Sequence, residues 1–502
     1  MPVHTRIGEK AVAIPSLIKL RGHLLDRLNL GAVTELVPSW VVDEVISECG
    51  RGEKRLRALP ARITLYFVLA LWLCPGAGYG EVLRMLFDQF HHEIGAGRIR
   101  VPTGAAAVQA RRRLGREPLK ALFRRLCGAH ADRDAPGMSA FGCQMALLKV
   151  AVDGTTLDVP DTVANRTAFG PAPGRSSKDP GRCPQIRVLM LIACGTRSIM
   201  DAVWAGRSTG EGTLLRKLVH GGAIRPGMLV LADRYFSGSP QVTAITGAGA
   251  HLIIRANPRR RLPVLKPLPD GSFLSLLPAA NQLTPELIAR ARAKGVRGHV
   301  QRRGVRARQA AGLPIRVIQA DIAIIPEHGE PRAESYLLIT TLLDSTVAPA
   351  AQVAALYAER WEAETGYADL KIHLSGPQTV LRSKDPDGVA QEVYALFIVY
   401  QIVQIARATA AREHPRPEPV DPDRVSFTVT LRALVRSIGR AAACGLSAAL
   451  NEIWASPQLV RRSRVKTRER KGTLAYARAV RKTPLSRTVY TITIRPPNTT
   501  EP

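Results

Sequence analysis

Two aspartates follow short apolar runs, at places where strands of an α/β sheet would end. Asp153 follows Leu147–Val152, and Asp233 follows Met228–Ala232. Functional side chains of α/β sheets gather at the carboxyl ends of strands, so we expect the two carboxylates to converge. Converging carboxylates need a cation, and hard oxygen ligands beside an anionic phosphate favour Mg²⁺. The pair predicts phosphoryl chemistry with two metal ions about 3.5–4 Å apart, which activate the attacking oxygen and stabilise the leaving one.

A third acid is expected on a helix over residues 350–374. At about 100° per residue, one face of this helix carries four reactive side chains within an arc of about 60°. They are Tyr357, Arg360, Glu364 and Lys371. The other acids of the helix point elsewhere: Glu359, Glu362 and Asp369. The row borders an apolar stripe, so Glu364 can reach the sheet carboxylates while Arg360 and Lys371 meet phosphates. The alternative is an ordinary amphipathic helix in which Arg360 and Glu364 form an i,i+4 pair.

The segments before residue 145 have helical periodicity. This pattern predicts an all-α N-terminal domain over residues 1–135. Within it, Thr103 can cap a helix over Gly104–Leu114. A short helix that ends in three arginines and follows another helix fits helix-turn-helix DNA recognition, although a solvated basic helix face explains it equally well. The three arginines are Arg111, Arg112 and Arg113.

The remaining chain reads as an interrupted α/β core with a basic tail. Strands and helices alternate over 145–256, and helix returns over 345–412, the part that carries the catalytic glutamate helix. Between them, the turns and β-type runs of 257–344 predict a largely β insertion. The C-terminal region, 413–502, is basic: 461–495 holds 12 Lys or Arg and one acid.

Composition narrows the class of protein. The 502 residues carry 71 Lys and Arg against 41 Asp and Glu, a net charge of +30, which predicts a polyanionic partner. Seven cysteines without a CxxC pair argue against a zinc finger or a disulfide framework. The longest apolar run of the N-terminal part, Leu65–Cys74, is shorter than the ~20 residues that span a bilayer. We therefore expect an intracellular protein with no membrane partner.

The three motifs together resemble a known family. Asp153-Gly-Thr, Leu-Ala-Asp233-Arg-Tyr-Phe and Tyr357-x2-Arg360-x3-Glu364-x6-Lys371 are similar to the catalytic motifs of DDE transposases of the insertion-sequence type-four family, including its YREK signature. The resemblance implies an α/β, RNase H-like catalytic core interrupted by the β insertion. It also implies that the two aspartates and the glutamate bind the metal, and that the tyrosine, arginine and lysine contact the DNA backbone near the cut.

The same resemblance implies the activity. It is that of a transposase without an organic cofactor, which binds the terminal inverted repeats of its own element and catalyses metal-dependent cleavage and strand transfer. The ions implied are two Mg²⁺, with Mn²⁺ as a possible substitute. The implied partners are double-stranded DNA, at the element ends and the target, and a second copy in a synaptic homodimer. The implied location is the bacterial cytoplasm, at the nucleoid.

Alternatives stay open on the sequence alone. An RNase H-like nuclease without strand transfer would use the same metals, and a basic architectural protein would explain the charge but not the three spaced acids. We expect Glu364→Gln to abolish cleavage and Glu362→Gln to be tolerated. Excision through a DNA hairpin also stays open. Some members of the family that this chain resembles hold a flipped base against a tryptophan of the insertion during this step, but here the insertion has no tryptophan. Only Phe273 and Tyr336 could stack on a flipped base.

Overall fold

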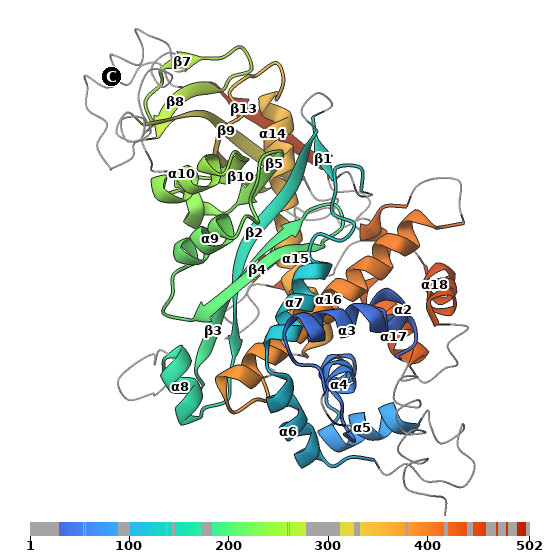
Figure 1. The fold of residues 1–502 in the computed structure, drawn as a ribbon. Helices are drawn as coiled ribbons and strands as arrows, with labels where there is room; N and C mark the ends of the chain where they lie inside the picture. The colour runs from blue at the N-terminus through green and yellow to red at the C-terminus, as the bar shows by residue number, and fades with distance from the viewer. Residues whose placement is uncertain are drawn as a thin grey trace, which may run out of the picture.

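The architecture comes from a computed structural model. It describes residues 30–53, 55, 57–88, 101–135, 137, 139–142, 146–171, 183–258, 260, 262–277, 312–325, 332–376, 380–415, 420–438, 445–457, 468–469, 478–479 and 489–497. Within these residues an 11-stranded sheet runs through the molecule, with helices on both faces (Figure 1). The strands, in spatial order, are β4 (Ile199–Gly206), β3 (Gln185–Ala193), β2 (Leu147–Asp158), β5 (Met228–Ala232), β6 (His251–Arg255), β10 (Arg332–Thr340), β9 (Leu313–Ile325), β8 (Phe273–Leu277) and β7 (Lys266–Pro267). Two more strands join at the sides: β1 (Ala140–Phe141) beside β2, and β13 (Val489–Arg495) beside β9.

The centre of the sheet is parallel. β2, β5 and β6 run in one direction, whereas β3 pairs antiparallel with both β2 and β4. Parallel strands are covered on both faces, which explains why β5 is an uninterrupted apolar run with every residue buried. This mixed sheet fits an RNase H-like core.

Helices from different parts of the chain cover the two faces. α9 (Glu211–His220) and α10 (Ser239–Gly247) pack on one face with Val150 and Val152 of β2. The other face, which receives Ala151, is covered by α15 (Trp361–Ala368) and α16 (Pro386–Arg412). Successive residues of a strand point to opposite faces, so a single strand contributes to both cores.

The helices of the N-terminal part gather around α16 (Figure 1). They are α2 (Ala32–Leu36), α3 (Ser39–Glu48), α4 (Ala61–Leu73), α5 (Tyr79–Asp88), α6 (Gly104–Leu114) and α7 (Glu117–Leu126). Every residue of α4 except Arg62 is buried, since this helix crosses the centre of the bundle. α6 has the bounds expected from the sequence, and the Thr103 hydroxyl caps it by accepting the N–H of Ala106 at 3.2 Å.

Two helices of the C-terminal region complete this bundle. α17 (Phe427–Ser437) and α18 (Gly445–Ala455) pack against α2 and α16. The Ser437 hydroxyl accepts the N–H of Ala32 at 3.0 Å. Gly31 has φ +60°, and a Cβ there would lie 2.2 Å from the Ser437 carbonyl oxygen, so this contact requires glycine. Part of the region predicted as a basic tail is therefore helical packing.

One helix of the described chain, α16, is long and apolar enough to cross a membrane by its length and composition. Its most apolar window is 94% buried inside the protein. Its hydrophobicity is explained by its place between the N-terminal helices and the sheet.

The described elements of the expected insertion, 257–344, are strands that extend the core sheet. β10 pairs with β6 and carries β9, β8 and β7 as a continuation of that sheet. Buried Arg316 of β9 fastens this extension to the next helix, α14 (Ala350–Tyr357). Its guanidinium donates to the Ala348 carbonyl at 2.6 Å and to Asp270, whose carboxylate also accepts the N–H of Ala350 at 2.9 Å.

The helix expected over 350–374 is also not uniform. It consists of α14, a 3₁₀ turn η2 (Ala358–Arg360), α15 and a π-helical turn η3 (Asp369–Leu374). The assumption of about 100° per residue therefore fails at η2, between α14 and α15, and again at η3, the end of the segment.

Candidate active site

Asp153 lies within β2, not at its end as the sequence suggested. β2 continues to Asp158, but its neighbour β5 stops earlier. The parallel pairing of Ala151 with Leu231 brings Asp153 beside Asp233, the first residue after β5. The two aspartates are therefore neighbours, although Asp233 follows the end of β5 and Asp153 lies within the longer strand β2.

Asp233 caps the turn that follows β5. Its Oδ1 accepts the N–H of Tyr235 at 2.9 Å and begins the 3₁₀ turn η1 (Arg234–Ser237). An aspartate at such a position stabilises a turn by itself. It also lies close enough to Asp153 for its charge to raise the pKa of that carboxyl group.

Two tyrosine hydroxyls hold the third motif over the sheet. The Tyr357 hydroxyl donates to the Ala232 carbonyl at 3.3 Å, at the end of β5. The Tyr367 hydroxyl donates to the Asp153 carbonyl at 2.6 Å and accepts the N–H of Met190 at 3.0 Å. The residues between these two anchors, which include the glutamate of the motif, are thereby fixed next to both aspartates.

Arg360 lies between the carboxylates. Its Nη2 donates to Glu364 Oε1 at 2.9 Å, and its Nη1 is 3.7 Å from Asp153 Oδ2. The Arg360 side chain is only 10% exposed, whereas that of Glu364 is 30% exposed. The i,i+4 pair that the sequence offered as an alternative thus exists, and it is part of the carboxylate cluster instead of excluding it.

Burial and neighbouring charge strongly affect Asp153. The pKa of its carboxyl group is raised to about 6: burial is the main cause and the carboxylates of Glu364 and Asp233 add to it, while Arg360 and the N–H of Gly154 act in the opposite direction. The ionised form of Asp153 is therefore poorly compensated by this chain alone. An additional cation would relieve this imbalance.

The donor set fits a divalent cation in its chemistry. Asp153, Asp233 and Glu364 supply carboxylate oxygens, which are the ligands that Mg²⁺ and Mn²⁺ prefer. In the part of the chain that the structure describes, no three acidic, His or Cys side chains converge closely enough to hold one ion as they stand. Arg360 lies between Asp153 and Glu364, so binding of an ion by both carboxylates requires its guanidinium to shift.

A fourth carboxylate, missed from the sequence, lies on the other side of β2. Glu211 begins α9, and its pKa is raised by burial and by Asp233, while Arg187 acts in the opposite direction. A Cβ on Gly154 would lie 2.6 Å from Glu211 Oε1, so a side chain at this position would require the Glu211 carboxylate to move. The glycine therefore lets this carboxylate approach β2 closely.

Tyr357 is not placed as the motif suggested, whereas the role of Lys371 stays a prediction. Tyr357 is 5% exposed with its hydroxyl bonded to the sheet, so in this structure it positions the helix and does not face a ligand. Lys371 lies in the π-helical turn, where burial lowers its pKa and Asp158 acts in the opposite direction. Of the two, Lys371 keeps an ammonium group that can turn toward a phosphate.

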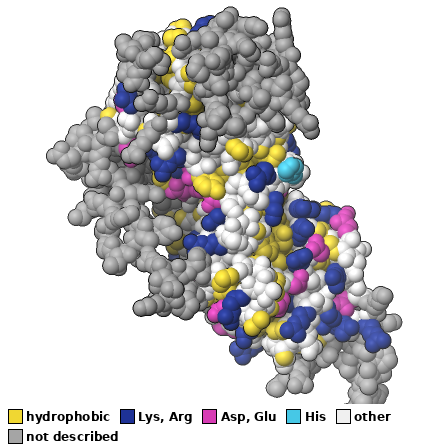
Figure 2. Space-filling model, turned by 90° about the vertical axis from the view of Figure 1, so that its left-hand side faces the viewer, with side chains coloured by type: hydrophobic (Ala, Val, Ile, Leu, Met, Phe, Trp, Pro, Cys, Tyr) yellow, Lys and Arg dark blue, Asp and Glu magenta, His cyan; other side chains and the backbone are white. Residues whose placement is uncertain are grey.

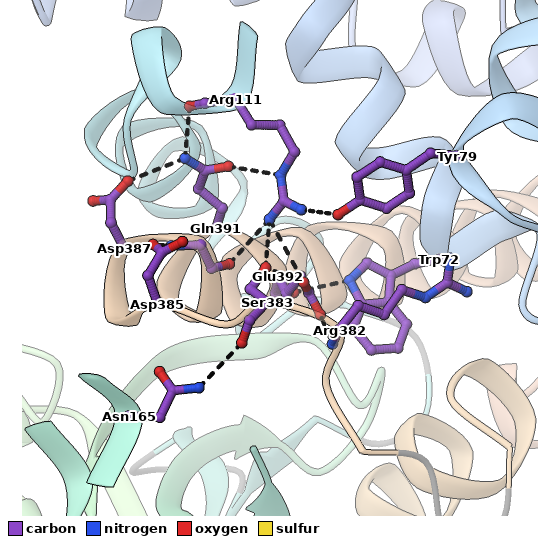
Figure 3. A network of polar contacts seen from close by, with 11 residues as sticks. Trp72, Tyr79, Arg111, Asn165, Arg382, Ser383, Asp385, Asp387, Gln391 and Glu392 are labelled. Carbon is purple, nitrogen blue, oxygen red and sulfur yellow. Dashed lines mark hydrogen bonds and ion pairs between the residues drawn. The ribbon is translucent and has the colours of Figure 1, made fainter. Parts of the chain in front are cut away.

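The three N-terminal arginines have different environments, and the expectation for Arg111 is wrong. Arg111 is 6% exposed, and its guanidinium donates to Gln391, Ser383 and the Gly388 carbonyl at 3.0, 2.9 and 3.1 Å (Figure 3). It also contacts Tyr79 and lies 3.6 Å from Glu392. This arginine therefore joins α6 to α16 and is not available to DNA.

The other two arginines of α6, Arg112 and Arg113, differ in their exposure to solvent. Arg113 is partly buried and donates to the Leu59 carbonyl at 3.2 Å. Arg112 is exposed. Only Arg112 of the three keeps the environment expected of a DNA contact.

Glu362 also differs from expectation. It does point away from the site, but it is 1% exposed and forms an ion pair with Arg197. Arg197 is held in addition by Asp423 at 2.7 Å. Glu362→Gln is therefore not the neutral substitution that the helical wheel suggested.

The two aromatic residues of the insertion that could stack on a flipped base both have contacts within the protein. Phe273 is 4% exposed inside the core. Tyr336 lies under the guanidinium of Arg255, 4.2 Å from the ring centroid. Most of the basic stretch 461–495 falls outside the described residues.

Comparison with known proteins identifies the family. Residues 27–124 match the family described as "Insertion element 4 transposase N-terminal", and residues 146–402 match "Transposase DDE domain". The chain is 23% identical over 416 residues to the transposase InsG for insertion sequence element IS4 of Escherichia coli (strain K12), an alignment that covers 82% of this chain and 84% of that protein. Among solved structures, a piggyBac transposase synaptic complex with hairpin DNA aligns with 12% identity and a TM-score of 0.38, over 86% of this chain and 82% of that one. The chain belongs to the DDE transposases of the insertion element 4 family, and it is an insertion-sequence transposase, an enzyme that acts on DNA.

Proposed function

We propose that this transposase binds the terminal inverted repeats of its element and catalyses metal-dependent cleavage at the ends, followed by strand transfer into target DNA. The observation that carries the proposal is the position of three carboxylates: Asp153 within β2 lies beside Asp233 at the end of β5, and the Arg360 guanidinium lies between Asp153 and Glu364. Asp153, Asp233 and Glu364 are the proposed ligands. Two Mg²⁺ ions bound there, or Mn²⁺ in their place, would supply the Lewis acid for an in-line displacement at phosphorus.

In this proposal the two basic residues of the motif, together with Arg112, bind and orient the DNA. Arg360 is held between two carboxylates, and its Nε is buried without a hydrogen-bond partner in the described part of the chain. A phosphate that approaches the site offers this guanidinium bidentate oxygen acceptors. Lys371 supplies a second cation from the end of the same helical segment, and Arg112 a third from the exposed side of α6.

The partner in this proposal is double-stranded DNA, at the element ends and at the target. Two ends must be held together for a concerted insertion, so we propose a homodimer in the synaptic complex. The net charge of +30 supports a polyanionic partner such as double-stranded DNA. An RNase H-like nuclease without strand transfer is the alternative, since it would use the same carboxylates.

Incubation of the purified protein with labelled DNA that carries the ends flanking its own gene, together with a plasmid target, tests the proposal. We expect cleavage at the ends and joined products with Mg²⁺, and neither with EDTA. Glu364→Gln should abolish both while DNA binding is retained. The matched control is Glu359→Gln, because Glu359 is a half-exposed acid of the same segment outside the cluster. Cleavage without joining would favour the nuclease, and metal-independent cleavage would contradict the proposed chemistry.

A further inference from the structure

A cavity of about 810 Å³ lies between the N-terminal helices and the edge of the sheet. α7 forms one wall, and the end of α9 with the loop leading into β5 forms the other. The floor is β4, the edge strand, whose outer side is not paired by any strand among the described residues. Figure 2 looks at the molecule from the side on which α9 and β4 lie in Figure 1, and Lys and Arg side chains are spread over this face.

Basic side chains line both walls. Arg116, the N-cap residue of α7, and Lys120 and Arg124 within it are spaced four residues apart, so they lie within an arc of about 80° and span about 12 Å. Lys217 and Arg225 come from the opposite wall. One strand of duplex DNA carries a phosphate for about every 3.4 Å of axis, so the row on α7 matches three to four phosphates.

Ion pairs within the protein leave most of this positive charge uncompensated. Arg116 lies 3.2 Å from Glu117 and Lys120 lies 3.7 Å from the same residue, but all three side chains are at least 35% exposed, and such pairs contribute little. Lys217 and Arg225 are exposed and have no ion pair with any described residue. These two cations are therefore ready to meet an external anion.

The cavity has a single acid among its described lining residues. Asp201 accepts the N–H of Ala202 at 2.7 Å. Burial raises its pKa, with Arg124 acting in the opposite direction. One partly compensated carboxylate cannot balance five basic side chains, so the cavity favours a polyanion.

The cavity floor and Asp153 lie at the same level of the sheet, two strands apart. Met190 of β3 pairs with Asp153 on one side and with Ala202 of β4 on the other. Adjacent strands are about 4.8 Å apart, so the cavity floor begins about 10 Å from Asp153. That distance corresponds to about three base pairs of duplex DNA.

We propose that this cavity binds the phosphodiester backbone of duplex DNA within a few base pairs of the cleaved bond, with Lys217 and Arg225 as contacts on the core side and the α7 row on the other. The inference rests on the proposed function, because it assumes DNA at the catalytic cluster. Contacts of this kind do not read base sequence, so the cavity positions DNA and does not select it.

The experiment measures the dissociation constant for DNA as a function of salt in EDTA, where no cleavage is needed. The test protein is the full chain with Lys217→Gln and Arg225→Gln. The control carries Arg412→Gln and Arg432→Gln, which remove the same charge from exposed positions outside the cavity. Each lost phosphate contact lowers the slope of log affinity against log salt by about 0.9, so we expect a decrease of about 1.8 for the test protein and little change for the control.

Two probes distinguish the source of the DNA. An equal loss of slope on an element-end duplex and on an unrelated duplex assigns the cavity to backbone contact with any DNA, including the target. A loss confined to the end duplex assigns it to the element end. Lys217→Arg with Arg225→Lys keeps both charges and should restore the slope, and an unchanged unfolding midpoint shows that the variants fold. An unchanged slope in the test protein, or an equal drop in the control, overturns the inference. Neither outcome bears on the proposed function, which fails only if the ends are not cleaved with Mg²⁺.

Discussion

Asp153→Asn should stabilise the metal-free protein while it destroys the site. Raising a carboxyl pKa from 3.8 to about 6 corresponds to about 3 kcal/mol against the ionised form at neutral pH. That figure already includes the attraction of Arg360, which acts in the opposite direction. An asparagine has no charge to bury, but its amide must find hydrogen bonds, which offsets about 1 kcal/mol. We expect a net gain of about 1–3 kcal/mol in the free energy of unfolding at pH 8 in EDTA.

The gain should depend on pH in a defined direction. Below about pH 4 the carboxyl group is protonated in both the folded and the unfolded chain, so it contributes no difference. Between about pH 4 and pH 6 the unfolded chain loses the proton first, and the wild-type protein loses stability as the pH rises. Above about pH 6 both forms are ionised and the difference is constant. The part of the advantage that comes from ionisation should therefore be about half as large at pH 5 as at pH 8, while the cost of about 1 kcal/mol for the asparagine amide is the same at both.

Denaturant unfolding at pH 5, 6, 7 and 8 measures this dependence. Asp161→Asn is the control, because Asp161 is an exposed acid paired with Arg166, and its effect should stay within about 0.5 kcal/mol. Addition of Mg²⁺ should stabilise the wild-type protein and not the asparagine variant, because a ligand that binds only the folded state raises its stability. An asparagine variant that is less stable than wild type at pH 8, or an advantage that does not change with pH, would refute the reasoning.

Three further predictions concern residues whose environments differ from the sequence expectation. Arg111→Ala should lower the free energy of unfolding by about 3–5 kcal/mol, because it leaves buried Glu392 without its cation, whereas Arg112→Ala should leave unfolding unchanged and reduce only the salt dependence of DNA binding. Glu362→Gln should cost about 2–4 kcal/mol in denaturant unfolding, since the Arg197 ion pair is buried. Deletion of residues 461–502 removes β13 from its pairing with β9, so the thermal midpoint should fall, and substitution of the basic residues is the better test of their role in DNA binding.

Local patterns predicted much of the catalytic core. The apolar run Met228–Ala232 is β5, the run Leu147–Val152 is the first half of β2, and strands and helices alternate over 145–256 as predicted, because apolar periodicity is a local property. The cap and bounds of α6 follow for the same reason. The convergence of Asp153 and Asp233 was also predictable, since the parallel strands that carry them are adjacent.

Non-local pairing explains most of what was missed. The extension of the core sheet depends on the pairing of β10 with β6, which no local pattern specifies. The burial of Arg111 depends on Gln391, 280 residues further along the chain, and the burial of Glu362 depends on Arg197, 165 residues before it. A charged residue with a distant partner has the same local sequence signal as one that faces solvent.

The helical segment that carries the third acid shows how the same chemical group takes two roles. Glu362 and Glu364 are two residues apart, so about 200° of helix separates their side chains. Glu362 turns into the protein, where it pairs with Arg197. Arg197 also pairs with Asp423, and this ion-pair network holds the segment in place. Glu364 stays 30% exposed beside Arg360 and the strand ends. Because the buried ion pair and the hydroxyl of Tyr367 fix this segment on the sheet, the position of Glu364 relative to the aspartates is set by packing, and the carboxylate itself remains accessible to ions and DNA.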